Sequence, residues 1–320
     1  MRKLPDVILK DEDGRDFPLT NLLGNYWVVY LYPKAGTQGC TLEAVEFNEL
    51  FEEFGGFIVA VSPDNPEKIA SFKKKHGLKF KLLSDTKKEL ASGLSAVKDG
   101  KLVRSTFIVD PWGRIRKEWY DVKVLGHAKQ VFDDFKKIVE EDLRVNPHIL
   151  ERRAFRGLRP DPIEDEKLLR LVEAAHLAPS CSNNQPWRFL VVRSKEGLEK
   201  LHATLSGGNY WAKHAPAIIL VYTKDELDCQ LDDNRNYALF DTGIAVGFLL
   251  IQATQMGLVA HPIAGYDPIR LKELFGVDGN VITLIAVGKW GKFDHLSEKH
   301  LEAERRPRLR RDLSQIVKMV

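Results

Sequence analysis

The feature that most limits the fold of this chain is an apolar strand pattern that passes straight into a helix pattern. Residues 26–32 read YWVVYLY, a short β-branched and aromatic run that predicts a buried strand. Pro33 and two glycines end this run, and from Ala44 to Phe54 apolar residues recur at helical spacing. The junction between the two patterns places Cys40 at the start of the predicted helix.

Cys40 therefore stands in an unusual electrostatic position. A thiol in the first turn of a helix faces free backbone N–H groups and the positive end of the helix dipole, and both favour the thiolate. We expect Cys40 to be a catalytic nucleophile. The alternative is an inert buried cysteine that packs as a small apolar side chain.

Strand and helix patterns continue to alternate behind this junction, which predicts an α/β sheet covered by helices. A polar stretch at 141–147 ends in Pro147 and predicts a boundary between domains at 1–143 and 147–320, and 320 residues are enough for two such domains. The predicted strands are 57–62, 80–85, 104–110 and 115–120, and the predicted helices are 67–76, 90–94 and 127–140.

The stretch from Tyr32 resembles the peroxidatic motif of peroxiredoxins, of the bacterioferritin comigratory protein (PrxQ) type. It reads Tyr-Pro-Lys-x-x-Thr-x-Gly-Cys-Thr-x-Glu-Ala, and the resemblance extends over residues 1–143 to an Arg-Ser-Thr-Phe segment at 104–107. It implies a thioredoxin-like fold and reduction of hydrogen peroxide or organic hydroperoxides. It also implies the roles of the site residues: Cys40 attacks the peroxide, Thr37 and Arg104 hold it, and Pro33 shields the thiolate.

One position departs from that pattern. Many members of the group carry a resolving cysteine five residues downstream of the peroxidatic one, and this chain has Val45 there. Cys40 therefore cannot close the usual local disulfide once it is oxidised to sulfenic acid, and another reductant must restore it.

The second half of the chain combines a basic segment, an amphipathic helix and a polar loop. Arg152 and Arg153 can clamp a phosphate through forked hydrogen bonds. The helix at 168–178 leads into the loop at 179–187, whose amides and hydroxyls can bind the edge of a planar heterocycle. A solvated helix end and a capped turn are the alternative interpretations.

This half resembles the FMN-dependent nitroreductase family over most of 147–320, which implies an α+β FMN-binding domain. The motifs are Arg-Arg-x-x-Arg from Arg152, Ala-Pro-Ser-x-x-Asn-x-Gln-Pro-Trp at 178–187, a long apolar helix from Asp241, and a loop at 261–265. Ala154 stands where the family usually has serine, so one hydrogen bond to FMN is lost. The implied FMN contacts are Arg152, Arg153, Ser180, Asn183, Gln185, Pro262, Ile263, Gly265, Lys289, Arg308 and Arg310.

The resemblance also implies an intertwined homodimer with FMN at its interface. No Gly-x-Gly-x-x-Gly fingerprint follows a strand, which favours NADH or NADPH that docks transiently over the flavin. The combined hypothesis is a peroxidase fused to its own reductase. Two alternatives remain: an independent thiol peroxidase with an external thiol reductant, tethered to a flavin reductase for quinones or nitro compounds, and a peroxide sensor or holdase.

Charge and hydropathy exclude several other classes. The net charge of +3 gives no reason to expect nucleic acid or a membrane as partner. The basic segment at 305–311 lacks the aromatic interleaving of a nucleic-acid site. No apolar run approaches the roughly 20 residues that span a bilayer, and the basic start at 1–6 has no apolar region behind it, so we expect no secretory signal.

The chain has three cysteines, which are too few and too odd in number for a disulfide framework. A reducing cytoplasm fits this count best, and we assign no metal ligands. Cys181 lies in the loop expected to border the flavin and is a candidate intermediary for electrons that travel to Cys40. Cys229 is a second candidate, and inert packing is the alternative for each.

Overall fold

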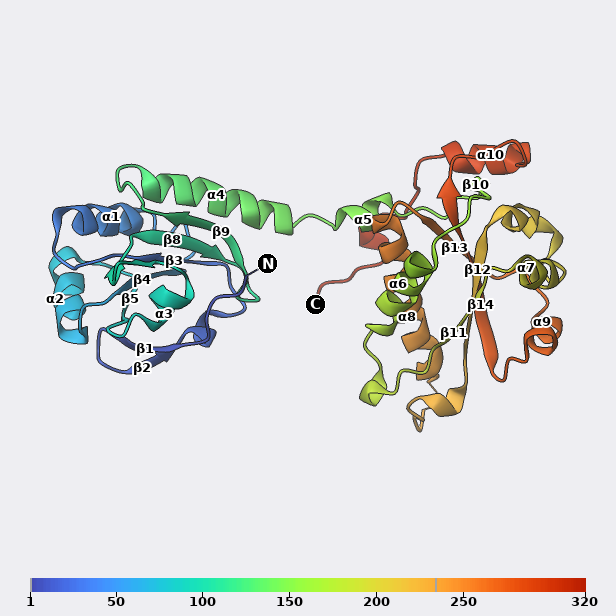
Figure 1. Ribbon diagram of the computed structural model, residues 1–320, viewed down its shortest axis with the longest axis horizontal. Helices are drawn as coiled ribbons and strands as arrows, with labels where there is room; N and C mark the ends of the chain where they lie inside the picture. The colour runs from blue at the N-terminus through green and yellow to red at the C-terminus, as the bar shows by residue number, and fades with distance from the viewer. Residues whose placement is uncertain (1, 234) are drawn as a thin grey trace. The chain divides into compact units, whose positions relative to one another are not determined.

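The chain divides between Arg144 and Val145 into two units, each with its own sheet and core. The computed structural model describes residues 2–233 and 235–320, and Figure 1 labels the helices and strands of both units.

The first unit is built on a seven-stranded mixed sheet in the order β2-β1-β5-β4-β3-β8-β9. β3 pairs in parallel with β4, and β4 with β5, whereas the other neighbours are antiparallel. Its strands are β1 (Ile8–Asp11), β2 (Asp16–Pro18), β3 (Trp27–Leu31), β4 (Ile58–Ser62), β5 (Lys81–Ser84), β8 (Ser105–Val109) and β9 (Ile115–Tyr120), and a separate hairpin pairs β6 (Val97–Lys98) with β7 (Lys101–Leu102).

Side chains of β3 alternate between two cores, so the sheet is the middle layer of three. Val28 and Tyr30 belong to one core with the helices α1 (Gln38–Glu49), α2 (Pro66–His76) and α4 (His127–Asp142). Trp27, Val29 and Leu31 belong to the other core, with α3 (Glu89–Gly93) and the short 3₁₀ helix η1 (Leu19–Leu22). The α/β layering predicted from the alternating patterns is confirmed.

Helix α1 is shorter than its apolar pattern predicts. It ends at Glu49, and the backbone then turns through Gly55 and Gly56, whose φ angles are 68° and 81°. Phe54 nevertheless packs into the same core as the helix. The apolar residues after Glu49 are therefore spaced as in a helix because the turn that carries them is buried, and not because the helix continues.

The second unit is built on an antiparallel sheet in the order β10-β14-β12-β11, with β13 also paired to β14. The longest strand, β14, is central, because its residues pair with three others. The strands are β10 (Leu158–Arg159), β11 (Arg188–Val192), β12 (Ala217–Thr223), β13 (Val259–Ile263) and β14 (Asn280–Trp290).

Helices cover both faces of this second sheet. One core contains α6 (Asp165–His176) and α8 (Tyr237–Gln255), and the other contains α7 (Lys195–His202), η3 (Gly207–His214) and α9 (Pro268–Phe275). The remaining elements are α5 (Pro147–Glu151), η2 (Cys181–Asn183), η4 (Asp225–Leu227), α10 (Glu298–Arg305) and η5 (Leu313–Gln315).

Helix α8 begins four residues before the Asp241 position predicted from the sequence, because the side chain of Asn236 caps the backbone N–H of Leu239. With a mean hydropathy of 1.4, it is long and apolar enough to cross a membrane by length and composition alone, a test that core helices also pass. Here α8 packs in the core of the unit, while Phe240 and Phe248 on another side of it are 60% and 45% exposed.

Candidate functional site

Cys40 and Arg104 meet because their strands are neighbours in the first sheet. β8 pairs with β3 and places Ser105 opposite Leu31, so Arg104 lies beside the segment that leads from β3 into α1. Cys40 is the third residue of α1 and is only 1% exposed. Nη2 of Arg104 donates to the Cys40 sulfur over 3.1 Å. A cation therefore contacts this sulfur in the first turn of α1.

Glu43 holds the other side of the Arg104 guanidinium. Its carboxylate accepts a hydrogen bond from Nη1 of Arg104 and is fully buried. Burial raises the pKa of Glu43 to about 7 although the Arg104 charge opposes the shift. The ion pair fixes the arginine toward Cys40. The sequence analysis missed Glu43, although it lies in the quoted motif one helical turn after the cysteine.

Thr37 and Pro33 lie in the exposed segment between β3 and α1. Thr37 is the N-cap residue of α1, but its hydroxyl caps no backbone N–H and donates instead to the carbonyl of Lys34 over 3.2 Å. The segment is anchored by Asp64, whose Oδ2 accepts from the backbone N–H of Ala35 over 2.6 Å. These two hydrogen bonds hold the segment that leads into α1.

Cys40 is the only free thiol in the described part of the chain. Val45 occupies the position of the usual resolving cysteine and is partly buried in α1. The first unit therefore offers no second thiol to an oxidised Cys40.

In the second unit, four arginines predicted to contact a flavin phosphate gather at one place. Burial lowers the pKa of Arg152, and the nearby charges of Arg308, Arg310 and Arg153 lower it further. Arg308 donates to the carbonyl of Ile149 over 3.0 Å and to that of Arg152, and Arg153 donates to the carbonyl of Arg306 over 2.7 Å. Mutually repelling guanidinium groups fit an anionic ligand such as a phosphate, which would relieve the repulsion.

The predicted polar loop is bent by three residues in the left-handed region. Ser182, Asn183 and Gln185 have φ angles of 50°, 59° and 53°, an arrangement that is unfavourable for residues other than glycine and is often found at binding sites. The hydroxyl of Ser180 accepts from the backbone N–H of Gln185 over 2.9 Å, and the side chain of Gln185 donates to the carbonyl of Asn183 over 2.8 Å. Gln185 also borders a hollow beside α6.

Pro262 and Ile263 lie in strand β13, not in the loop predicted for 261–265. The loop was implied by the family resemblance and is wrong for these two residues, because Pro262 pairs with Ile285 on β14. Gly265 follows the strand, and a side chain there would lie 2.5 Å from Nδ2 of Asn209. Lys289 lies on β14 opposite Arg159 of β10. Within residues 2–233 and 235–320, no hydrogen bond joins Pro262, Ile263, Gly265 or Lys289 to the four arginines Arg152, Arg153, Arg308 and Arg310.

Cys181 and Cys229 are bonded to each other, over a sequence separation of 48 residues. The cysteine count predicted no disulfide framework and left the two as separate thiols, which is wrong for this pair. Three cysteines can form one disulfide and leave one free thiol, which here is Cys40. Because both sulfurs are joined, neither is available as a metal ligand, although a carboxylate oxygen of Asp228 lies within 4.8 Å of each.

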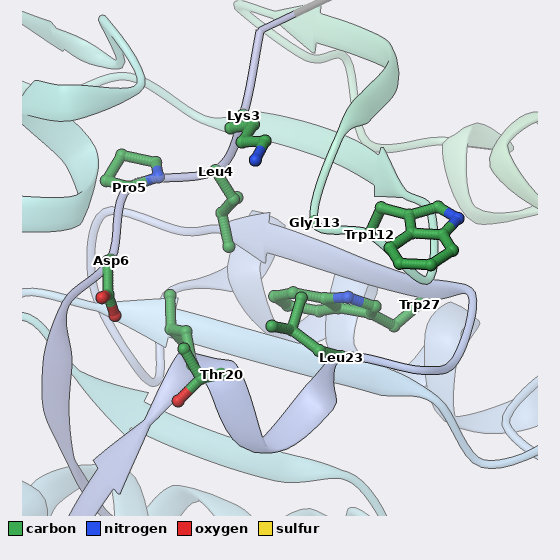
Figure 2. Close-up of a pocket in the computed structure, with 10 residues that line it drawn as sticks. Lys3, Leu4, Pro5, Asp6, Thr20, Leu23, Trp27, Trp112 and Gly113 are labelled. Atoms are coloured by element: carbon green, nitrogen blue, oxygen red, sulfur yellow. The ribbon is translucent and has the colours of Figure 1, made fainter. Parts of the chain in front are cut away.

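A hollow in the first unit lies apart from the Cys40 site. Figure 2 shows it between the N-terminal residues and two tryptophans, Trp27 and Trp112. Trp27 begins β3, whereas the segment with Thr37 and Cys40 follows the end of that strand. The hollow is therefore at the opposite end of β3 from the thiol, and none of the predicted peroxide-binding residues lines it.

Comparison with known proteins divides the chain in the same way. Residues 1–118 match the AhpC/TSA family, and residues 149–207 and 203–289 match the nitroreductase family. Peroxiredoxin Bcp of Bacillus subtilis is 40% identical over 151 residues, covering 44% of this chain and 96% of that protein. Peroxiredoxin Bcp of Xanthomonas campestris is 37% identical over 137 residues, covering 39% and 86%.

For the second unit, a crystal structure described as an oxidoreductase containing FMN is 31% identical, covers 55% of this chain and 92% of its own, and has a TM-score of 0.49. The family matches confirm both predicted fold classes, a thioredoxin-like peroxiredoxin fold followed by a nitroreductase-like fold.

Proposed function

Because this chain belongs to the AhpC/TSA family of peroxiredoxins and continues into a nitroreductase-family unit, we propose that it is a thiol peroxidase supplied by its own flavin reductase. The peroxidase occupies 1–143 and reduces hydrogen peroxide or organic hydroperoxides at Cys40. The reductase occupies 147–320 and takes electrons from NADH or NADPH. One observation carries the proposal: a peroxidatic thiol without a second thiol in its own unit shares a chain with an oxidoreductase unit.

The first half-reaction follows from the contacts of Cys40. Its thiolate attacks one peroxide oxygen, so that a sulfur–oxygen bond forms and the oxygen–oxygen bond breaks. Arg104, already 3.1 Å from the sulfur, stabilises the negative charge that moves onto the departing oxygen. That oxygen takes a proton and leaves as water or an alcohol, and Cys40 remains as sulfenic acid. Glu43 keeps Arg104 in place throughout.

The second unit has residues that fit FMN, and FMN would supply hydride chemistry there. Arg152, Arg153, Arg308 and Arg310 would hold the phosphate, because their charges gather in one place. Ser180, Asn183 and Gln185 would bind the edge of the heterocycle from the bent loop. Pro262, Ile263, Gly265 and Lys289 would border it from β13, β14 and the residues between them.

The assembly and the compartment are part of the same proposal. We expect a homodimer through the second unit, and the exposed Phe240 and Phe248 on α8 are apolar surface that a second copy could cover. We expect a cytoplasmic protein without a nucleic-acid or membrane partner, in keeping with its small net charge of +3.

The test follows consumption of NADH or NADPH by the FMN-loaded protein after addition of hydrogen peroxide, under anaerobic conditions that exclude oxidation of the flavin by oxygen. Wild type is compared with Cys40→Ser. We expect peroxide-dependent consumption that the substitution abolishes. Equal rates in both proteins, or none in either, would overturn the internal electron supply and favour a peroxidase that uses an external thiol. A single oxidation without turnover in the presence of reductants would favour a peroxide sensor.

A further inference from the structure

Glu304 is a buried acid that accepts hydrogen bonds from neutral donors. It lies in α10 and is only 8% exposed. Its Oε1 accepts from the backbone N–H of Arg156 over 2.8 Å, and its Oε2 accepts from the backbone N–H of Gly157 over 3.4 Å and from the indole N–H of Trp290 over 2.9 Å. Hydrogen bonds to an ionised group are stronger than those between neutral groups. The Glu304 carboxylate therefore ties α10 to this backbone and to the last residue of β14.

The backbone that Glu304 binds is itself fixed against the end of β14. The carbonyl of Gly157 accepts from the backbone N–H groups of Gly291 over 2.9 Å and of Lys292 over 3.2 Å. A Cβ at Gly157 would lie 2.6 Å from the ring of Phe293, so only glycine fits this approach. The position of α10 is thus set against a rigid part of the second unit.

Arg153 is held on both sides of this junction. Its Nη2 donates to the carbonyl of Ala303 over 3.5 Å and to that of Arg306 over 2.7 Å, just before and just after the buried acid. Its guanidinium carbon lies 5.0 Å from the centre of the Phe155 ring, which stacks on the ring of Trp290 with 4.6 Å between the centroids. The place of this arginine therefore depends on how α10 meets the end of β14.

Arg308 lies beyond the C-terminal end of α10 and depends on the same junction. It donates to the carbonyl of Ile149 over 3.0 Å and to that of Arg152. The chain that follows α10 is thereby held beside a segment about 150 residues earlier in the sequence. Each of the two segments brings arginines to the proposed phosphate site.

The Glu304 charge does not neutralise these arginines. Among the residues that the structure describes, no carboxylate oxygen lies within 4.0 Å of a guanidinium nitrogen of Arg152, Arg153, Arg308 or Arg310. An acid paired with them would compete with a phosphate for the same donors. An acid that binds neutral N–H groups can place the arginines and leave their charge for a ligand.

We propose that Glu304 is a positioning residue of the phosphate site. By fixing α10 against Gly157 and Trp290, it sets the spacing of Arg153 and Arg308, and so makes the site prefer a flavin with a phosphate to one without. It acts through the arginines and not on the ligand. The inference rests on the proposed function for the ligand, FMN.

The test compares the full chain, freed of flavin, with its Glu304→Gln variant in equilibrium fluorescence titrations. The ligands are FMN and riboflavin, which has the same ring and no phosphate. Glutamine keeps the shape of the side chain, but its NH₂ group cannot accept a hydrogen bond, so one side of the junction is lost. We expect FMN affinity to fall roughly 5- to 10-fold, about the cost of weakening one hydrogen bond to a charged group, and riboflavin affinity to stay unchanged. Unchanged FMN affinity, or an equal loss for both ligands, would overturn the positioning role.

Two further variants control for general damage. Glu302→Gln changes an exposed acid on the same helix and should leave both affinities at the wild-type values. Trp290→Phe keeps a ring against Phe155 but removes one donor to Glu304, so FMN affinity should fall by a smaller factor while riboflavin affinity is retained. If thermal unfolding shows that Glu304→Gln does not fold, Trp290→Phe decides the question, and unchanged FMN affinity in that variant would refute the proposal.

A coupling experiment checks that Glu304 acts through the arginines. In the background Arg153→Ala/Arg308→Ala, the further change Glu304→Gln should alter FMN affinity by less than about 2-fold, because the groups it places are gone. The full loss seen in the wild-type background would show another route of action and contradict the proposal.

These titrations separate the inference from the proposed function. A wild-type protein that prefers FMN to riboflavin, together with a Glu304→Gln variant that keeps this preference, overturns the inference alone. A wild-type protein without any preference for FMN has no phosphate site, which overturns the inference together with that part of the proposed function. The supply of electrons to Cys40 is tested separately, by peroxide-dependent consumption of NADH or NADPH at saturating FMN.

Discussion

The guanidinium of Arg104 touches the sulfur of Cys40, with Nη2 donating over 3.1 Å. This contact brings the residue just before β8 against the first turn of α1, although 64 residues separate the two in sequence. In the proposed reaction, this contact joins the nucleophile Cys40 to the group that stabilises the negative charge on the departing peroxide oxygen.

Replacing Arg104 should slow the reaction of Cys40 with hydrogen peroxide more than any other single change outside the cysteine. For Arg104→Ala we expect a loss of roughly 100-fold or more in the second-order rate constant, the usual cost of removing a preorganised donor. Arg104→Lys should recover only part of this, because lysine cannot bridge Glu43 and Cys40 at once. Stopped-flow fluorescence measures the rate. Arg116→Lys, in the ion pair with Asp142, is the matched control, and an equal loss there would refute the assignment.

Thr37 should matter for peroxide binding and little for stability. Its hydroxyl does not cap α1 and makes one exposed bond, to the carbonyl of Lys34. Thr37→Val should therefore leave the melting temperature nearly unchanged while the rate with peroxide falls about 10-fold or more, as expected for one lost hydrogen bond to a charged group. Thr37→Ser keeps the hydroxyl and should retain the rate. A similar loss in both variants would point to packing instead of the hydroxyl.

Glu43 should make the first unit less stable as the pH rises from 4.5 toward 7. Its pKa is raised from 4.5 to about 7 in the folded protein, so folding favours the protonated form. The resulting stabilisation is complete below the unfolded pKa and is lost as the pH rises through the folded one. Urea unfolding at closely spaced pH values should show this slope in wild type. In Glu43→Gln the slope over this window should flatten, and an unchanged slope would assign it to another group.

The four arginines Arg152, Arg153, Arg308 and Arg310 should bind the phosphate of FMN and not its ring. Arg152→Ala should weaken FMN binding by roughly 10- to 100-fold, as expected for a lost charge-assisted hydrogen bond. Riboflavin, which has no phosphate, should bind both proteins equally. Equilibrium fluorescence titration measures both ligands. Arg193→Ala, in the exposed ion pair with Asp165, is the control and should bind FMN as wild type does. Equal weakening for riboflavin would indicate general damage to the site.

Local patterns predicted most of the first unit because its strands are recognisable from the sequence alone. The five buried residues of β3 and of β8 are short apolar runs bounded by turns. Local patterns could not predict which residues far apart in the sequence contact each other. The contact of Arg104 with Cys40 depends on the antiparallel register of β3 and β8, and only the family resemblance pointed to it. Glu43 was missed because burial, which raises its pKa, cannot be read from one glutamate in an amphipathic helix.

The second unit was harder to predict for two physical reasons. Pro262 lies inside β13, where the family resemblance implied a loop. Among the described strands β13 is paired only with β14, and an edge strand of this kind tolerates the missing N–H of a proline. The bridge between Cys181 and Cys229 depends on folding that brings η2 beside the residues that follow η4, and no local pattern encodes this closeness. Short motifs pointed to candidate ligand-binding residues, but not to which of them lie close to each other.

The bridge between Cys181 and Cys229 closes a long loop of chain that includes β11 and β12, with a sequence separation of 48 residues. In the loop-entropy model, a crosslink of that span lowers the entropy of the unfolded chain and so adds about 4 kcal/mol to the free energy of unfolding. The reductase unit should therefore resist proteases when oxidised and yield to them when reduced.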